Sequence, residues 1–204
     1  MRRTAHEDAA RVFGFDGDVV EVGFPQGELG LAITMDVAEH EQRRRAGVAP
    51  LTDRRAVTAL WELPHEIEIS ASALPTWALE RVVKLGPAVR ATSAGYRRMV
   101  RPPVHISGVT ASGRSLPRLL DCVGQLSAVA SMGVVVHVGV TESDPALLDA
   151  ALYGVGVAHA HGHELELVLY PGVVQPTTGP FLWWVAELAY EQLLGRLTTS
   201  GPRR

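Results

Sequence analysis

The chain has 204 residues, of which 47% are hydrophobic and 20% charged, and its formal net charge at pH 7 is −3. This composition is that of a globular protein long enough to bury most of its apolar surface, and it excludes a disordered chain. No apolar run approaches the roughly 20 residues of a membrane span, and the polar N-terminus is unlike a signal peptide. We therefore expect a cytoplasmic protein with no membrane partner.

Charge and cysteine content limit the classes of partner further. Cys122 is the only cysteine, which excludes an internal disulfide and a cysteine-rich zinc site. Arginines occur in short groups, Arg43–Arg45, Arg54–Arg55 and Arg97–Arg98, but no series of aromatic residues for base stacking accompanies them. Together with the negative net charge, this argues against a nucleic-acid partner and favours ion pairs of the arginines with Glu39 or Glu41.

The first 88 residues are predicted to mix strands and helices. Residues 1–17 are expected to form a weakly helical arm, and residues 18–24 and 28–35 alternate as two strands of a β-hairpin. Helices are expected over residues 37–45, 52–63 and 75–84, with Thr52 or Asp53 capping the second. Residues 65–70 alternate between polar and apolar side chains, which predicts one further strand at the edge of a sheet.

The rest of the chain has a more regular pattern after residues 89–103, whose arginines, glycine and double proline predict an irregular linker. Strands are expected over residues 104–109, 134–140 and 164–170, and helices over residues 115–131, 145–159 and 179–197. This β-α-β-α-β-α order predicts a Rossmann-like half with a parallel sheet. We therefore expect a single three-layer α/β domain over residues 1–204, with a mostly parallel sheet extended by the N-terminal hairpin and one further strand. Residues 198–204 are expected to be a tail.

The sharpest motif is G-x-x-x-x-G-[basic]-[ST] between a predicted strand and a predicted helix. It has the form of a phosphate-binding loop, with arginine in place of the usual lysine. In that interpretation the glycines allow the strained backbone, Arg114 contacts a phosphate and Ser115 supplies a metal-bound oxygen. A helix N-terminus that binds some other anion is the broader alternative. The candidate ligand-binding residues of this loop and the next are Gly108, Thr110, Ser112, Gly113, Arg114, Ser115, Thr141 and Glu142.

Parallel neighbouring strands place their carboxyl-terminal loops side by side. We therefore expect Arg114 to be partly exposed and to lie next to Glu142. Asp144 is explained by capping, because Asp144-Pro145 places an N-cap residue before proline at the first helical position.

Histidines alternate along the chain at His159, His161 and His163. In an extended backbone they would share one side and could bind zinc or iron, with Glu164 nearby. The favoured alternative is a helix end with Gly162 in the left-handed conformation, at the sheet edge opposite the predicted crevice. No metal or other cofactor is therefore assigned. His137, inside an apolar strand, is predicted to be a core histidine.

The last predicted helix carries an apolar stripe, which should face the sheet, and Trp184 lies on the other side near Glu187 and Glu191. An aromatic side chain among charged residues is typical of an interface anchor, so we expect a homo-oligomer or a protein partner. The sequence shows no nucleophile-base motif. The favoured function is a non-catalytic scaffold or assembly protein. The alternative is a domain, with or without catalysis, that binds a small anionic or nucleotide-like ligand through the loops after Val109 and Val140.

Overall fold

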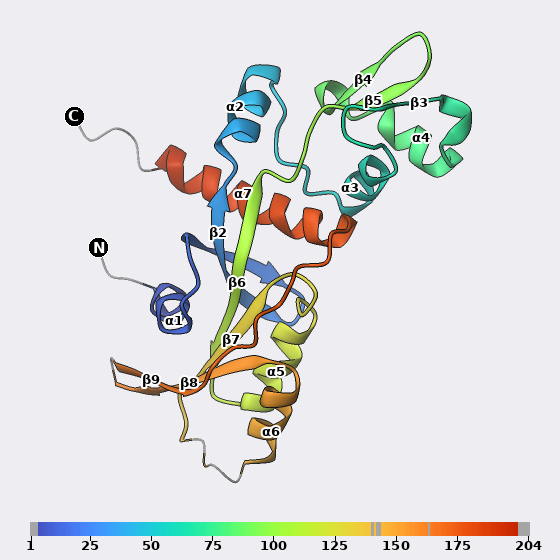
Figure 1. The fold of residues 1–204 in the computed structure, drawn as a ribbon. Helices are drawn as coiled ribbons and strands as arrows, with labels where there is room; N and C mark the ends of the chain where they lie inside the picture. The colour runs from blue at the N-terminus through green and yellow to red at the C-terminus, as the bar shows by residue number, and fades with distance from the viewer. Residues whose placement is uncertain (1–3, 140, 142–143, 163, 200–204) are drawn as a thin grey trace, which may run out of the picture. The chain divides into compact units, whose positions relative to one another are not determined.

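The chain is represented by a computed structural model that describes residues 4–139, 141, 144–162 and 164–199 (Figure 1). Its residues group into two compact units, each built from two segments that are distant in sequence. The first unit comprises Met1–Thr34 and Ile106–Thr177, and the second comprises Met35–His105 and Thr178–Arg204. Residues 89–103, the predicted linker, lie wholly within the second unit.

Most of the larger sheet belongs to the first unit, and its strand order is β1-β2-β6-β7-β8-β9. β1 and β2 form the predicted antiparallel hairpin. The three strands β6, β7 and β8 are parallel neighbours, and β9 runs antiparallel to β8. The sheet is therefore mixed, with a parallel centre. The strands are β1 (Asp18–Phe24), β2 (Gly27–Met35), β6 (Val104–Gly113), β7 (Ser131–Val136), β8 (Val155–His161) and β9 (Glu164–Leu169).

The strand predicted over residues 164–170 is present, but its predicted parallel direction and the helix predicted over residues 145–159 are wrong in part. Residues 155–161, expected to end a helix, form the third parallel strand β8, and residues 164–169 form the antiparallel β9. The preceding helix α6 (Pro145–Leu152) ends before Gly154, whose φ of 66° is in the left-handed region. A short apolar run such as Val155–Ala158 does not distinguish helix from strand by its own periodicity. Pairing with β7 and β9 decided the outcome.

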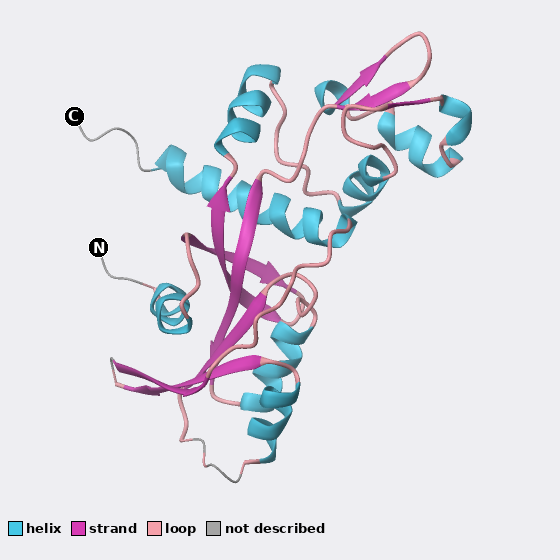
Figure 2. Ribbon diagram, viewed as in Figure 1, coloured by secondary structure: helices cyan, strands magenta, loops and turns pink. Residues whose placement is uncertain are grey.

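Helices cover both faces of the sheet of the first unit (Figure 2). The expected N-terminal arm is a capped helix, α1 (Ala5–Phe13), in which Thr4 and Glu7 form a reciprocal capping box. Phe13 packs over Gly133, where the Cβ of any other residue would overlap the aromatic ring. On the other face, α5 (Leu116–Gly124) places Leu119 against Gly113. These contacts give the first unit three layers.

In its described residues, the second unit combines four α-helices and two short 3₁₀ helices with a small antiparallel sheet of order β3-β5-β4. The core contains Leu60, Leu63, Val82 and Trp183, all inaccessible to solvent. The helices predicted over residues 37–45, 52–63 and 75–84 are present, and Asp53 caps the second of them. The elements are α2 (Val37–Ala46), α3 (Arg54–Trp61), β3 (Glu68–Ile69), η1 (Ala71–Ala73), α4 (Thr76–Val82), η2 (Gly86–Ala88), β4 (Val89–Ala91), β5 (Tyr96–Arg98) and α7 (Pro180–Thr199).

The predicted irregular segment 89–103 contains the hairpin of β4 and β5. Each of these strands has three residues, which is too short for a period of two to be recognised in the sequence. Val89 and Tyr96 are partly buried against the core of the second unit, so tertiary packing holds the hairpin in place. In the described part of the chain, no helix combines the length and the apolarity needed to cross a membrane.

A network of charged side chains is buried in the second unit. Arg43, Glu39 and Glu187 are each 0% exposed. The Arg43 guanidinium donates from Nε to Glu39 Oε1 at 2.7 Å, and from Nη1 and Nη2 to the two carboxylate oxygens of Glu187 at 2.8 and 2.7 Å. Glu187 also accepts hydrogen bonds from Trp183 Nε1 and from the backbone amide of Leu51. The planar guanidinium thus joins two carboxylates in one buried network.

Candidate functional site

The parallel strands end at a common edge of the sheet. In their register, Gly113 on β6 pairs with Val136 on β7, and Val136 pairs with His159 on β8. The expected parallel pairing of the strands that begin at residues 104 and 134 is confirmed. The polar residues that follow these positions therefore lie at the carboxyl edge, where ligands bind in many parallel sheets.

Gly108–Gly113 form the end of a strand rather than the loop that the glycine-rich motif predicts, whereas ligand binding by the motif residues stays a prediction. β6 continues to Gly113, and pairing with β7 keeps Gly108, Thr110 and Ser112 in an extended strand. Gly108 lies under the ring of Phe15, and Thr110 is buried. Since strand backbone amides are used in the sheet, they cannot point together at a phosphate.

The second half of the motif lies at the start of α5. Arg114 is exposed and Ser115 is the N-cap residue, although its side chain makes no capping hydrogen bond. Thr141 is exposed, while Glu142 lies outside the described residues. The exposure expected for Arg114 is present, and its expected proximity to Glu142 stays a prediction.

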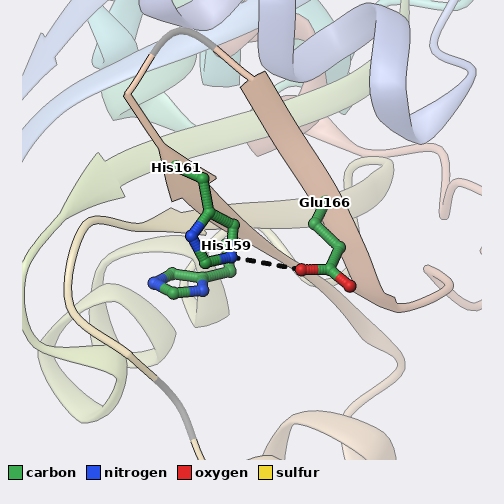
Figure 3. Close-up of side chains that lie close together, drawn as sticks. All are labelled: His159, His161 and Glu166. Carbon is green, nitrogen blue, oxygen red and sulfur yellow. Dashed lines mark hydrogen bonds and ion pairs between the residues drawn. The ribbon is translucent and has the colours of Figure 1, made fainter.

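His159 and His161 lie on one face of β8, and Glu166 of β9 faces them (Figure 3). The two imidazole rings have centroids 4.0 Å apart, and His161 Nε2 lies 3.1 Å from Glu166 Oε2. One potential ligand atom from each of the three side chains falls within 4.8 Å of the other two. His163, the third histidine of the sequence pattern, lies outside the described residues. The shared side of His159 and His161, expected for an extended backbone, is present.

The histidines lie at a different edge from the one predicted. The sequence pattern predicts residues 164–170 as the third parallel strand, which would put the histidines opposite the crevice. Since β8 is that strand, His159 and His161 lie at its carboxyl end, the same edge as Gly113 and Val136. Gly162 is left-handed as expected, with a φ of 64°, but it belongs to the β8–β9 turn rather than to a helix end.

Glu166 was missed in the sequence, which pointed only to Glu164. The available signal was the alternation of Glu164, Leu165 and Glu166 after a glycine-containing turn, which predicts a second strand of a hairpin. In the register, His161 pairs with Glu164 and His159 pairs with Glu166. Paired residues of antiparallel strands share a face, so both carboxylates lie on the face of the two histidines.

A further histidine lies at this edge. His137 was predicted to be a core residue, but β7 ends at Val136 and the His137 side chain is exposed. Its Nε2 lies 2.7 Å from Ser112 Oγ, at hydrogen-bonding distance. The chain after His137 passes close to the cluster of His159, His161 and Glu166. A Cβ built on Gly139 would lie 4.0 Å from His159 Cε1. The sequence has no signal for the Ser112–His137 pair, since it depends on strand register.

The predicted interface residues of α7 have mixed outcomes. The surface position predicted for Glu187 was wrong, because this carboxylate is buried against Arg43. The indole of Trp184 is half-buried, and its Nε1 donates to the carbonyl oxygen of Thr52 at 2.8 Å. Glu191 is exposed. Contacts within the chain thus bury part of the Trp184 ring. The predicted role of Trp184 in an assembly is untested.

The chain matches no family model, no curated protein and no solved structure.

Proposed function

We propose that the protein binds a divalent transition metal ion, with zinc as the best fit, through His159, His161 and Glu166. The observation that carries this proposal is the convergence of two imidazoles and one carboxylate at the carboxyl edge of the sheet. Two histidines and one glutamate form a common ligand set of zinc sites that keep a position open for water or substrate.

The distances are compatible with one ion. Ligand atoms about 2 Å from a tetrahedral zinc ion lie roughly 3.3 Å from one another. His161 Nε2 and Glu166 Oε2 are already 3.1 Å apart. The side chains of His161 and Glu166 are exposed, so small rotations can bring the set together without disturbing the core. The metal would bind both imidazoles in their neutral form.

The charge of the ligand set suggests how the site would be used. One carboxylate and two neutral imidazoles leave a bound Zn²⁺ with a net charge of +1. An open coordination position on such an ion attracts water or a small anion. The alternative of a small anionic ligand is thereby retained at the same edge of the sheet, with the metal rather than a phosphate loop as its binding group.

Zinc titration by calorimetry, on protein purified without an affinity tag, tests the proposal. We expect His161→Ala to weaken zinc binding at this site by at least about 100-fold, because loss of a direct ligand costs more than the 10–100-fold typical of outer-shell partners. His105→Ala is the matched control, since His105 is an exposed strand histidine outside the cluster. Equal zinc binding by wild type and His161→Ala would refute the proposal.

A further inference from the structure

A second group of potential metal ligands lies in the first unit, away from the β8–β9 hairpin. His6 comes from α1, Glu21 from β1 and Glu28 from β2, and one ligand atom of each lies within 4.8 Å of the other two. In the β1–β2 register Glu21 pairs with Gly30, and Glu28 is two residues before Gly30. Both carboxylates therefore extend from the sheet face that carries α1.

Gly30 makes room for the imidazole. A Cβ built at this position would lie 2.6 Å from His6 Cβ and 2.5 Å from Thr110 Oγ1. Real side chains do not tolerate such distances, so any residue larger than glycine would displace His6. The absence of a side chain at position 30 thus allows the histidine to lie directly over the strands that carry the two carboxylates.

Hydrogen bonds determine which nitrogen of His6 carries the lone pair. The buried Thr110 hydroxyl donates to the carbonyl oxygen of Gly30 at 3.3 Å, and lies 3.0 Å from His6 Nδ1. Because its hydrogen is used, the hydroxyl accepts from Nδ1–H, which leaves the lone pair of the imidazole on Nε2. Metal-binding histidines are commonly oriented by such a second hydrogen bond.

The two carboxylates also lie close together. One oxygen of each carboxylate lies within 4.8 Å of the other and of a nitrogen of His6. A divalent cation bound between the two carboxylates would offset the repulsion of their negative charges. Glu28 is exposed and Glu21 half-buried, so an ion can reach them from solvent.

We propose that His6, Glu21 and Glu28 form a second metal site, independent of the hairpin site. One imidazole nitrogen and two carboxylates are a harder ligand set than that of the hairpin, with one more negative charge. Carboxylate-rich sets suit Mn²⁺, whereas sets rich in imidazole suit Zn²⁺. The structure thus predicts two sites in one unit with different metal preferences.

Manganese titration followed by electron paramagnetic resonance tests this site. The double variant His159→Ala/His161→Ala removes the hairpin ligands and is the starting protein. We expect it to bind about one equivalent of Mn²⁺, and Glu28→Gln in this background to weaken that binding at least about 10-fold. Asp18→Asn is the matched control, because Asp18 is an exposed carboxylate of β1 that is three residues from Glu21 and on the opposite face.

A second pair of variants tests the role of Thr110 in orienting His6. Thr110→Val removes the hydroxyl at similar volume and should weaken Mn²⁺ binding about 10-fold, whereas Thr110→Ser should restore it. Absence of Mn²⁺ binding in the double variant, or binding that Glu28→Gln leaves unchanged, would overturn the inference. Neither result bears on zinc binding at the hairpin. Conversely, unchanged zinc binding in His161→Ala would remove the proposed function and leave this site standing.

Discussion

Two clusters of charged and titratable side chains, one in each unit, differ in how their charges are balanced. In the second unit, Glu39 and Glu187 flank Arg43, and all three are inaccessible to solvent. In the first unit, Glu166 lies against His159 and His161 on an open strand face. The cluster of the second unit contains its own permanent cation, Arg43. The cluster of the first unit contains one carboxylate and two imidazoles, and an imidazole is a cation only when it is protonated.

This difference suggests different roles for the two clusters. A buried carboxylate must be paired, and Arg43 provides five donors in a fixed planar arrangement that matches two carboxylates. A longer ion pair of Arg101 with Glu39, at 3.7 Å, adds a second cation, so residues of the chain balance both carboxylates. The histidine cluster has lone pairs at an accessible edge, and a metal ion is the partner that would use all three groups at once.

The largest expected effect is on the buried network. Arg43→Met should lower the free energy of unfolding by about 3–5 kcal/mol, because it leaves the buried Glu187 carboxylate without its cation and Glu39 with only the longer pair to Arg101. Arg44→Met is the matched control in the same helix, since Arg44 and Glu41 form an exposed pair whose loss should cost at most about 1 kcal/mol. Urea denaturation measures both. Similar losses in the two variants would contradict the structural role of Arg43.

The histidine cluster should show the opposite behaviour. In the presence of a metal chelator, His161→Ala should change the free energy of unfolding by no more than about 0.5 kcal/mol, because the side chain is exposed. Zinc at 100 times the dissociation constant of the hairpin site should stabilise the wild type by about 2.7 kcal/mol, and His161→Ala should lose that increment. Thermal unfolding with and without zinc measures it. A large loss of stability without metal would instead make the cluster structural.

Trp184 allows a sharper test of the second unit. Trp184→Phe keeps an aromatic ring beside Phe181 and Arg54 but removes the hydrogen bond to Thr52, so the free energy of unfolding should fall by about 1 kcal/mol. Light scattering of the wild type and of Trp184→Glu tests the predicted assembly. A monomeric wild type, or an oligomer unaffected by the glutamate, would show that Trp184 serves only its own chain.

The smallest expected effect concerns His65 of the second unit. Burial lowers its pKa from 6.5, and its buried Nε2 has no hydrogen-bond partner among the described residues. Just below pH 6.5, the unfolded state thus binds more protons than the folded state. The stability that neutral His65 provides is therefore complete above pH 6.5, and it decreases as the pH falls through the lowered pKa of the folded state. His65→Gln should therefore lose less stability than the wild type between pH 7.5 and 5.5. Parallel denaturation curves at the two pH values check this, and equal losses would contradict it.

Local chemistry in the sequence was enough to predict several elements. The β1–β2 hairpin follows from alternation and a glycine-containing turn, and Asp53 and Asp144 cap helices as their positions before α3 and α6 indicate. The shared side of His159 and His161 follows from the period of two in any extended backbone. Each of these predictions depends on residues within a few positions of one another.

Contacts between distant residues decided the rest. Whether Val155–Ala158 is helix or strand depends on its pairing with β7 and β9, and the direction of β9 decides that Glu166 faces His159. The pairing of β6 with β7 likewise makes the motif at Gly108–Gly113 a strand. Glu187 is buried because Arg43, 144 positions away in sequence, provides its cation. Such outcomes depend on which segments meet in space, because short apolar runs fit more than one structure and a charge can be buried only where a partner comes to it.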